Sequence, residues 1–137
     1  MKDSSFLCSC IVIAFSGSWS APVAAVGQWI RVSFTTDVNV HSVITQGRQN
    51  QDQWVTSYQM QYSPDNVQHH YVRDSNGAVK AFSGNSDRNT KVENVLSLPT
   101  TARSVALLAL TWHGFVCLRF EVTGCKAPRE CCSFSVT

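Results

Sequence analysis

The chain has 137 residues, of which 44% are hydrophobic, which suffices for one domain with a core and is too little for two ordinary domains. The formal net charge is +2, and the basic residues are scattered along the chain, whereas phosphate recognition needs a basic patch or stripe. Nucleic acid is therefore not expected as a partner. A charged fraction of 15%, with many Ser, Thr, Asn and Gln residues, suits a β protein from outside the cell.

Residues 1–16 contain an apolar run from Phe6 to Phe15, which follows Lys2 and precedes small residues. This order resembles a secretory signal. The β-branched residues of the run equally suit a buried strand, and the run is too short to cross a bilayer as a helix. Two alternatives therefore stay open: a cleaved signal, or a segment that replaces a strand of the fold.

Alternating apolar and polar residues predict the first strands that follow this run. One strand extends over residues 28–34 and ends near residues 35–37, and another extends over residues 38–45 and ends at Gly47. The polar residues 48–53 then form the loop of a hairpin. These alternating segments are typical of half-buried strands.

The strand over residues 54–63 returns from that loop. A period of two places Trp54, Thr56 and Tyr58 on one face and Val55 on the other. We expect Trp29, Trp54 and Tyr58 to lie in the core, because large aromatic side chains are usually mostly buried.

Turn residues divide the middle of the chain. Pro64-Asp65-Asn66 and Ser75-Asn76-Gly77 predict two turns, with a short strand over residues 69–72 between them. Residues 82–89 are expected to form a loop.

The last third of the chain predicts three more strands, over residues 90–96, 103–110 and 116–123. Pro99 is expected to end the first of them. The second is apolar on both faces, so it should be a central strand, although the pattern also fits a short helix. Short strands separated by turns, without an amphipathic helix, indicate a β-sandwich or barrel.

The third strand should place Leu118, Phe120 and Val122 inward. Arg119 and Glu121 then point outward and are expected to take part in cross-strand charge pairing. The tail over residues 126–137 is expected to be loose.

Six cysteines are many for a cytosolic domain of this size. The spacings of Cys8 with Cys10 and of Cys131 with Cys132 do not suit a zinc knuckle, so disulfides are the expected use. Cys117 and Cys125 would lie about 26 Å apart on one extended strand, which is far beyond disulfide reach.

A series of short motifs keeps its order and spacing from about Gly17 to Cys125. The motifs are QWIRV (28–32), VITQGR (43–48), DQWVTSY (52–58), YS (62–63), FSGNSD (82–87), AR (102–103), TWHG (111–114) and LRFEVTGC (118–125). As an ordered set they closely resemble the discoidin domain, also called the coagulation factor V/VIII C-type domain.

The resemblance implies an all-β fold over residues 17–125, a jelly-roll-like antiparallel β-sandwich that is usually extracellular. It also implies loops at one end that contact anionic phospholipid, glycan or a protein such as collagen. The family normally begins with a Cys and further strands that carry two apolar binding loops, so the resemblance implies a copy that lacks its first strands. Cys125 matches the family's terminal cysteine, for which Cys8 or Cys10 is the candidate partner.

Residues 48–53 match the third binding loop of the family, and their composition separates the possible ligands. Membrane-inserting loops carry apolar tips, which gain about 25 cal/mol per Å² of buried apolar surface. This loop instead offers amides, one Arg and one Asp, which favours hydrogen bonding to a glycan or protein. A simple solvated hairpin is the alternative.

Trp112 and His113 lie in another loop that the resemblance places at the same end. Trp112 would stack on a sugar, rest at a lipid interface, or pack into the core. The candidate ligand-binding residues are Arg48, Gln49, Asn50, Gln51, Asp52, Gln53, Trp112 and His113.

We expect no catalysis, cofactor or metal. His69 and His70 are neighbours that would point to opposite faces of a strand, and no nucleophile elbow, paired-carboxylate motif or phosphate loop is present.

The sequence therefore predicts a non-enzymatic extracellular or secreted binding or adhesion module for a cell-surface glycan or a matrix protein. Peripheral binding to anionic phospholipid is one alternative. The other is a truncated, non-functional copy with an exposed sheet edge.

Overall fold

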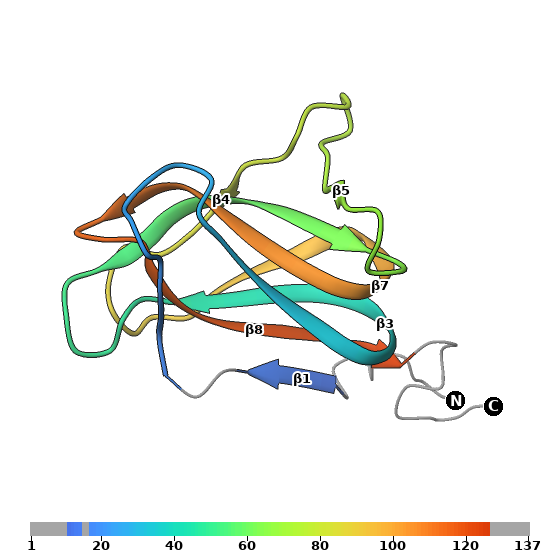
Figure 1. Ribbon diagram of the computed structural model, residues 1–137, viewed down its shortest axis with the longest axis horizontal. Helices are drawn as coiled ribbons and strands as arrows, with labels where there is room; N and C mark the ends of the chain where they lie inside the picture. Colours follow the sequence, from blue (N-terminus) through green and yellow to red (C-terminus); the bar gives the residue numbers. More distant parts are fainter. Residues whose placement is uncertain (1–10, 15–16, 127–137) are drawn as a thin grey trace.

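Every regular element in the described residues, 11–14 and 17–126 of this computed structural model, is a β-strand (Figure 1). The strands are β1 (Ile11–Ala14), β2 (Trp19–Ser20), β3 (Trp29–Gln46), β4 (Trp54–Ser63), β5 (His70–Tyr71), β6 (Phe82–Ser83), β7 (Val92–His113) and β8 (Cys117–Lys126). All named strand pairs are antiparallel, so the expected all-β antiparallel fold is confirmed.

The strands pair in the order β1-β8-β3-β7-β4-β5, with β2 added to β8 and β6 added to β4. The long strands β3 and β7 run beside each other over both halves of their length. The first half of β3 pairs with the part of β7 that β4 flanks, whereas the second half of β3 is flanked by β8. The sheet therefore folds over into two layers around one core (Figure 1).

Two predicted strand ends are wrong. β3 continues through residues 35–37 without ending. Its register with β7 shifts there, between Ser33 and Val38. β7 likewise continues through Pro99. Pro99 falls between Val95 and Thr100, where β7 has no residue paired with β3, so its missing N–H removes no ladder hydrogen bond.

The core lies between the two layers, and its largest fully buried side chains include Tyr58, Met60 and Phe120. Residues 104–107 of β7 are buried on both faces, which confirms the predicted central strand and excludes the short helix. Leu118, Phe120 and Val122 of β8 are buried, as the alternation predicts.

The prediction for β4 is only partly right. Val55 is buried, whereas Thr56 is only half-buried, because the register of β4 with β7 shifts between Val55 and Tyr58 and reverses the faces there. Of the three aromatic residues expected in the core, only Tyr58 is fully buried. Trp54 is half-buried, and Trp29 is 52% exposed with the Arg31 guanidinium 4.6 Å from its ring centroid.

The Tyr58 hydroxyl accepts a hydrogen bond from Asn94 Nδ2 at 3.0 Å. Burial raises the pKa of Tyr58 to about 12, and the hydrogen bond from Asn94 opposes that shift only in part.

Both predicted turns of the middle segment form. The Asp65 carboxylate accepts hydrogen bonds from the backbone N–H groups of Val67 and Gln68, and Gly77 donates its N–H to the carbonyl of Asp74. The expected strand over residues 69–72 is reduced to β5.

Four connections gather at one end of the molecule, on the left of Figure 1: residues 21–28, 48–53, 84–91 and 114–116. At the edge of the sheet, β1 pairs with β8 so that Ile11 faces Gly124. Among the described residues, no helix is long and apolar enough to cross a membrane.

Candidate functional site

The loop of residues 48–53 is held closed by hydrogen bonds of its own. The N–H of Arg48 donates to the carbonyl of Gln53 at 2.9 Å, and Arg48 Nη1 donates to Gln53 Oε1 at 3.0 Å. Arg48 Nε donates to Asn50 Oδ1 at 3.2 Å. Arg48 and Gln53 therefore brace the loop, while Gln49, Asn50, Gln51 and Asp52 are exposed at its tip.

The loop of residues 84–91 packs directly against it. A Cβ at Gly47 would lie 2.7 Å from the carbonyl oxygen of Asp87 and 3.2 Å from Cα of Arg88, so only glycine permits this approach. Arg88 Nε donates to Asp52 Oδ1 at 2.8 Å and joins the two loops by an ion pair. Asp52 is thus placed by a residue 36 positions away in the sequence.

Internal hydrogen bonds fix the shape of residues 84–91. The buried side chain of Asn85 donates through Nδ2 to the carbonyls of Thr45 and Thr90, at 3.0 and 2.9 Å. The Asp87 carboxylate accepts from the hydroxyl and N–H of Thr90 and from the N–H of Asn89, and these bonds hold the pKa of Asp87 below its usual range. Asp87 is therefore an exposed, ionised carboxylate at neutral pH.

A third connection, residues 114–116, follows β7 and contacts the first loop. His113, at the end of β7, stacks on Trp54 with ring centroids 4.5 Å apart and an interplanar angle of 15°. Gly114 has a φ of 78°, and a Cβ there would overlap the carbonyl oxygen of Asp52. Three loops that are distant in sequence thus contact one another around Asp52 and Trp54.

Residues of the first two loops, together with Trp54, line an open pocket of about 360 Å³, which we call the first pocket. Its lining residues are Asp52, Trp54, Asp87, Arg88, Asn89 and Thr90. One wall is an aromatic ring, and the others carry carboxylate, guanidinium, amide and hydroxyl groups. The first pocket can therefore offer an apolar platform beside hydrogen-bond donors and acceptors.

The structure brings together only part of the predicted set of site residues. Asp52 lies in the first pocket, and His113 is exposed beside its Trp54 wall. Trp112 is half-buried and packs against the core cluster, so it presents less surface than an exposed loop tryptophan would.

Sequence reasoning misses residues 87–90 as site residues and assigns Trp54 to the core. Residues 82–87 form one of the discoidin-like motifs, but the sequence predicts only a loop there, and no local pattern indicates that this loop meets residues 48–53. The polar run of residues 86–90 is the available signal.

Arg119 and Glu121 do contact other strands and loops, but Arg119 makes no charge pair within the described part of the chain. Glu121 pairs with Lys91, with Oε1 and Nζ 3.3 Å apart. Arg119 instead donates to the carbonyls of Gly47 and Arg88 and to Asn89 Oδ1. Its role is to anchor the two loops to β8.

The described cysteines are both buried. Cys117 Sγ lies 3.0 Å from Ser20 Oγ and 3.3 Å from Gln53 Oε1. Cys125 lies on β8, and its candidate partners Cys8 and Cys10 lie outside the described residues. Within residues 11–14 and 17–126, no group of three or more His, Cys, Asp or Glu side chains could hold a metal ion.

Comparison with known proteins agrees with this fold. The family described as F5/8 type C domain matches residues 14–122. Retinoschisin from Takifugu rubripes is 35% identical over 112 residues, which cover 81% of this chain and 40% of that protein. Lactadherin from Rattus norvegicus is 36% identical over 110 residues, which cover 79% of this chain and 26% of that protein.

The solved structure of wild-type discoidin II from Dictyostelium discoideum superimposes with a TM-score of 0.71 at 34% identity. The match covers 78% of this chain and 40% of that one. The chain thus spans less than half the length of each of these three proteins, and its fold is the expected discoidin-like sandwich. With the family match extending over most of its length, the chain belongs to the F5/8 type C, or discoidin, domain family.

Proposed function

We propose that this chain is an extracellular binding and adhesion module that recognises a glycan through the first pocket. Its family is one of binding modules rather than enzymes. The observation that carries the proposal is the Trp54 ring beside the Asp52–Arg88 ion pair. A sugar ring presents apolar C–H faces, which can pack against the Trp54 ring, and a rim of hydroxyls, which can hydrogen-bond to Asp52 and Arg88.

The charges around the first pocket favour a neutral ligand. The carboxylates of Asp52 and Asp87 and the Arg88 guanidinium all line this pocket, so an anion would meet two negative charges for one positive charge. Hydroxyl groups, in contrast, can donate to the carboxylates and accept from Arg88 and Asn89. We therefore expect a hydroxyl-rich, uncharged sugar.

The test is binding of the full chain to a glycan array and to immobilised collagen. The double variant Asp52→Ala with Arg88→Ala should weaken glycan binding by about tenfold or more, because it removes charge-assisted hydrogen bonds. The matched control is Asp74→Ala with Lys80→Ala, which removes an exposed ion pair outside the first pocket. Undiminished glycan binding by the first variant would exclude this site, and collagen binding that alone is lost would assign the site to a protein ligand.

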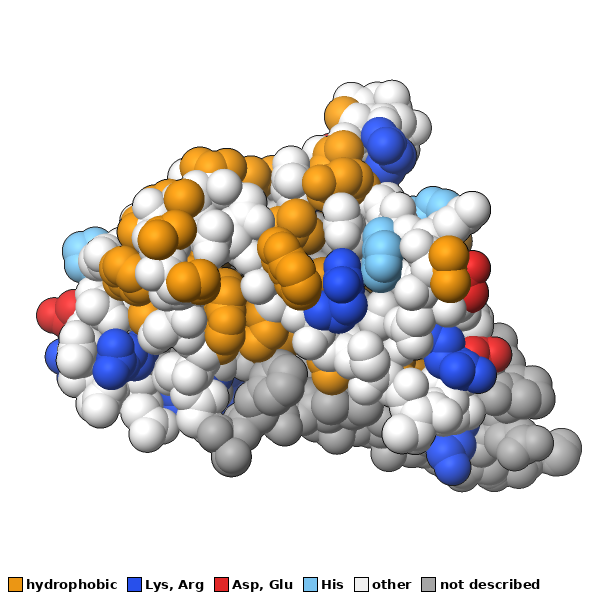
Figure 2. All heavy atoms as spheres, in the orientation of Figure 1, with side chains coloured by type: hydrophobic (Ala, Val, Ile, Leu, Met, Phe, Trp, Pro, Cys, Tyr) orange, Lys and Arg blue, Asp and Glu red, His pale blue; other side chains and the backbone are white. Residues whose placement is uncertain are grey.

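A second candidate function, peripheral binding to anionic membranes, is favoured by one observation. The apolar segment of residues 22–26 (Pro-Val-Ala-Ala-Val) lies at the same end as the loops, with Val23 54% and Val26 67% exposed. Figure 2 shows apolar side chains gathered over this end, with basic side chains nearby. Apolar tips beside cations suit a membrane surface of negative charge.

The membrane candidate is tested with phosphatidylserine vesicles at low salt. The wild-type chain should sediment with the vesicles, and Val23→Asp with Val26→Asp should abolish sedimentation. Val67→Asp is the control, since Val67 is 76% exposed on the segment between β4 and β5. A wild-type chain that stays in the supernatant eliminates this candidate.

The domain boundaries and the location outside the cell are part of the proposal. Pairing of β1, residues 11–14, with β8 supports that short segment as part of the fold rather than of a cleaved signal. N-terminal sequencing of protein secreted from expressing cells distinguishes the two. A cooperative melt of the full chain would count against the alternative of a truncated copy that no longer folds stably.

A further inference from the structure

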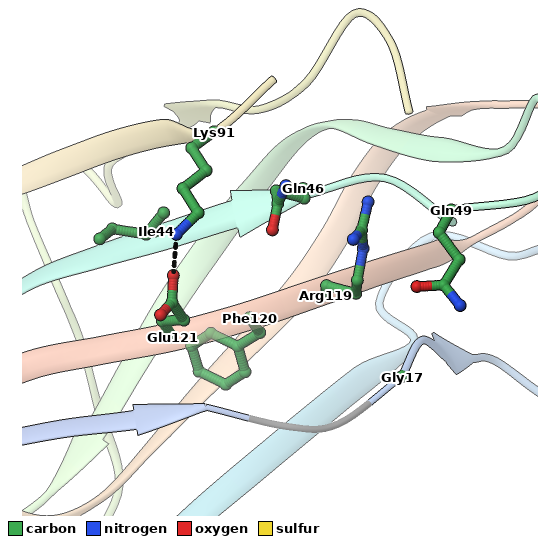
Figure 3. A pocket seen from close by; sticks show the side chains of 8 residues that line it. All are labelled: Gly17, Ile44, Gln46, Gln49, Lys91, Arg119, Phe120 and Glu121. Atoms are coloured by element: carbon green, nitrogen blue, oxygen red, sulfur yellow. Dashed lines mark ion pairs between the residues drawn. The ribbon is translucent and has the colours of Figure 1, made fainter. Parts of the chain in front are cut away.

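Figure 3 shows a second pocket, of about 220 Å³. Its polar lining residues come from β3, from residues 48–53, from β8 and from the position before β7: Gln46, Gln49, Lys91, Arg119 and Glu121. Gln49, a candidate loop residue that does not line the first pocket, therefore faces this second pocket.

Asn89 connects residues of the two pockets. Asn89 lines the first pocket, and its Oδ1 accepts a hydrogen bond from Arg119 Nη2 at 2.6 Å. The carbonyl of Asn89 accepts from Gln46 Nε2, also at 2.6 Å. Because Arg119 and Gln46 both line the second pocket, a ligand that crosses Asn89 would enter both pockets.

The second pocket holds polar groups that the described part of the fold leaves unused. Glu121 Oε1 is buried and has no hydrogen-bond partner, although it pairs electrostatically with Lys91 Nζ. The hydrogen bonds of Arg119 use Nε and Nη2, which leaves Nη1 to donate. The side-chain amide of Gln49 makes no hydrogen bond to the described residues and can both donate and accept.

A sugar hydroxyl is the ligand group that fits this mixture. It donates one hydrogen bond and accepts others, so neighbouring hydroxyls can bridge a carboxylate and a guanidinium. Glu121 Oε1 is paired with Lys91 but has lone pairs to spare, so a ligand hydroxyl can donate to it as well.

We propose that the second pocket is an additional glycan subsite, so that the ligand is a neutral oligosaccharide of at least two residues lying across Asn89. The inference rests on the proposed glycan function of the first pocket. It adds the size of the ligand and the residues that select for it: Gln49, Lys91 and Glu121.

The experiment uses the full chain and calorimetric titration with neutral mono- to tetrasaccharides of galactose, N-acetylglucosamine and mannose. The wild-type chain should bind the oligosaccharides of one series more tightly than the monosaccharide. Gln49→Ala with Lys91→Ala should weaken oligosaccharide binding about tenfold, the loss expected for about two hydrogen bonds, and leave monosaccharide binding unchanged. Ile44→Trp, which fills the second pocket, should have the same selective effect.

The matched control is Gln68→Ala with Lys80→Ala, since Lys80 is also ion-paired and lies away from both pockets. Equal affinity for monosaccharide and oligosaccharide, or equal losses for both in the Gln49 and Lys91 variant, would overturn the second subsite while leaving the first pocket intact. A chain that binds no sugar of any length would instead remove the glycan function itself, and this inference with it.

Discussion

Gly114→Ala tests whether the loops of the site are pressed against each other as described. At a φ of 78°, any non-glycine residue adopts a left-handed backbone conformation that costs about 1–2 kcal/mol. The new Cβ would also overlap the carbonyl oxygen of Asp52 and lie 3.1 Å from Cγ of Gln53. Overpacking of this kind costs a further 1–3 kcal/mol or so.

Gly77→Ala separates these two contributions. Gly77 has a φ of 87°, yet a Cβ there would meet nothing within 4 Å. It should therefore lose only the backbone contribution, about 1–2 kcal/mol of the free energy of unfolding. Gly114→Ala should lose about 2–5 kcal/mol, the sum of the backbone and overpacking contributions, and it should also weaken glycan binding because Asp52 is displaced from Arg88.

Urea denaturation measures the difference. With an m-value of about 2 kcal/mol per M, an additional loss of about 2 kcal/mol shifts the midpoint of Gly114→Ala about 1 M below that of Gly77→Ala. Equal midpoints for the two variants would show that the loop of residues 114–116 does not press on Asp52, and the described site would then be wrong.

Three further predictions concern stability and covalent structure. Asn85→Ala should lower the free energy of unfolding by about 3 kcal/mol, measured in urea, because two carbonyls lose their buried donor; a loss below about 1 kcal/mol would contradict this role. The folded-state pKa of Tyr58, about 12, exceeds its usual value of 10.0, so the protonated phenol contributes up to about 3 kcal/mol to the free energy of unfolding. This contribution is complete below pH 10 and is lost as the pH rises towards 12. Urea midpoints at about pH 9 and about pH 11.5 should therefore fall more for the wild type than for Tyr58→Phe, and parallel falls would refute the shift. Peptide mapping of the unreduced protein should find Cys125 in a disulfide, because it is buried on β8 and matches the terminal cysteine of the family; a free Cys125 thiol would refute this.

Strand alternation is sufficient to predict β8 and the centre of β7. From Leu118 to Val122 of β8 the buried and half-buried positions alternate, so the period of two holds over that stretch, whereas residues 122–125 are all buried. The period fails in β4, where two irregularities in the register with β7 between Val55 and Tyr58 reverse the faces, and no local pattern signals them. The same limit explains Pro99, which is tolerated only because the opposite strand leaves that stretch unpaired.

The site is less accessible to sequence reasoning than the fold. The loop of residues 48–53 can be found because it connects two predictable strands. The contacts of this loop with Arg88 and Gly114 cannot be predicted from sequence, because they depend on how the folded sheet brings the ends of β3, β6 and β7 together. The half-buried position of Trp54 likewise cannot be predicted. One sequence shows that a tryptophan is large and apolar, but not that a neighbouring strand ends beside it.

The close approaches at Gly47 and Gly114 also limit how the loops at this end of the protein can be engineered. Each glycine lets the backbone of one loop touch another, so a loop transplanted from a relative would have to arrive with the partner loops that fit it. Replacement of side chains at the exposed tips, at Gln49, Asn50 and Gln51, leaves those backbone contacts untouched. A library that seeks new ligands should therefore vary tip side chains at constant loop length.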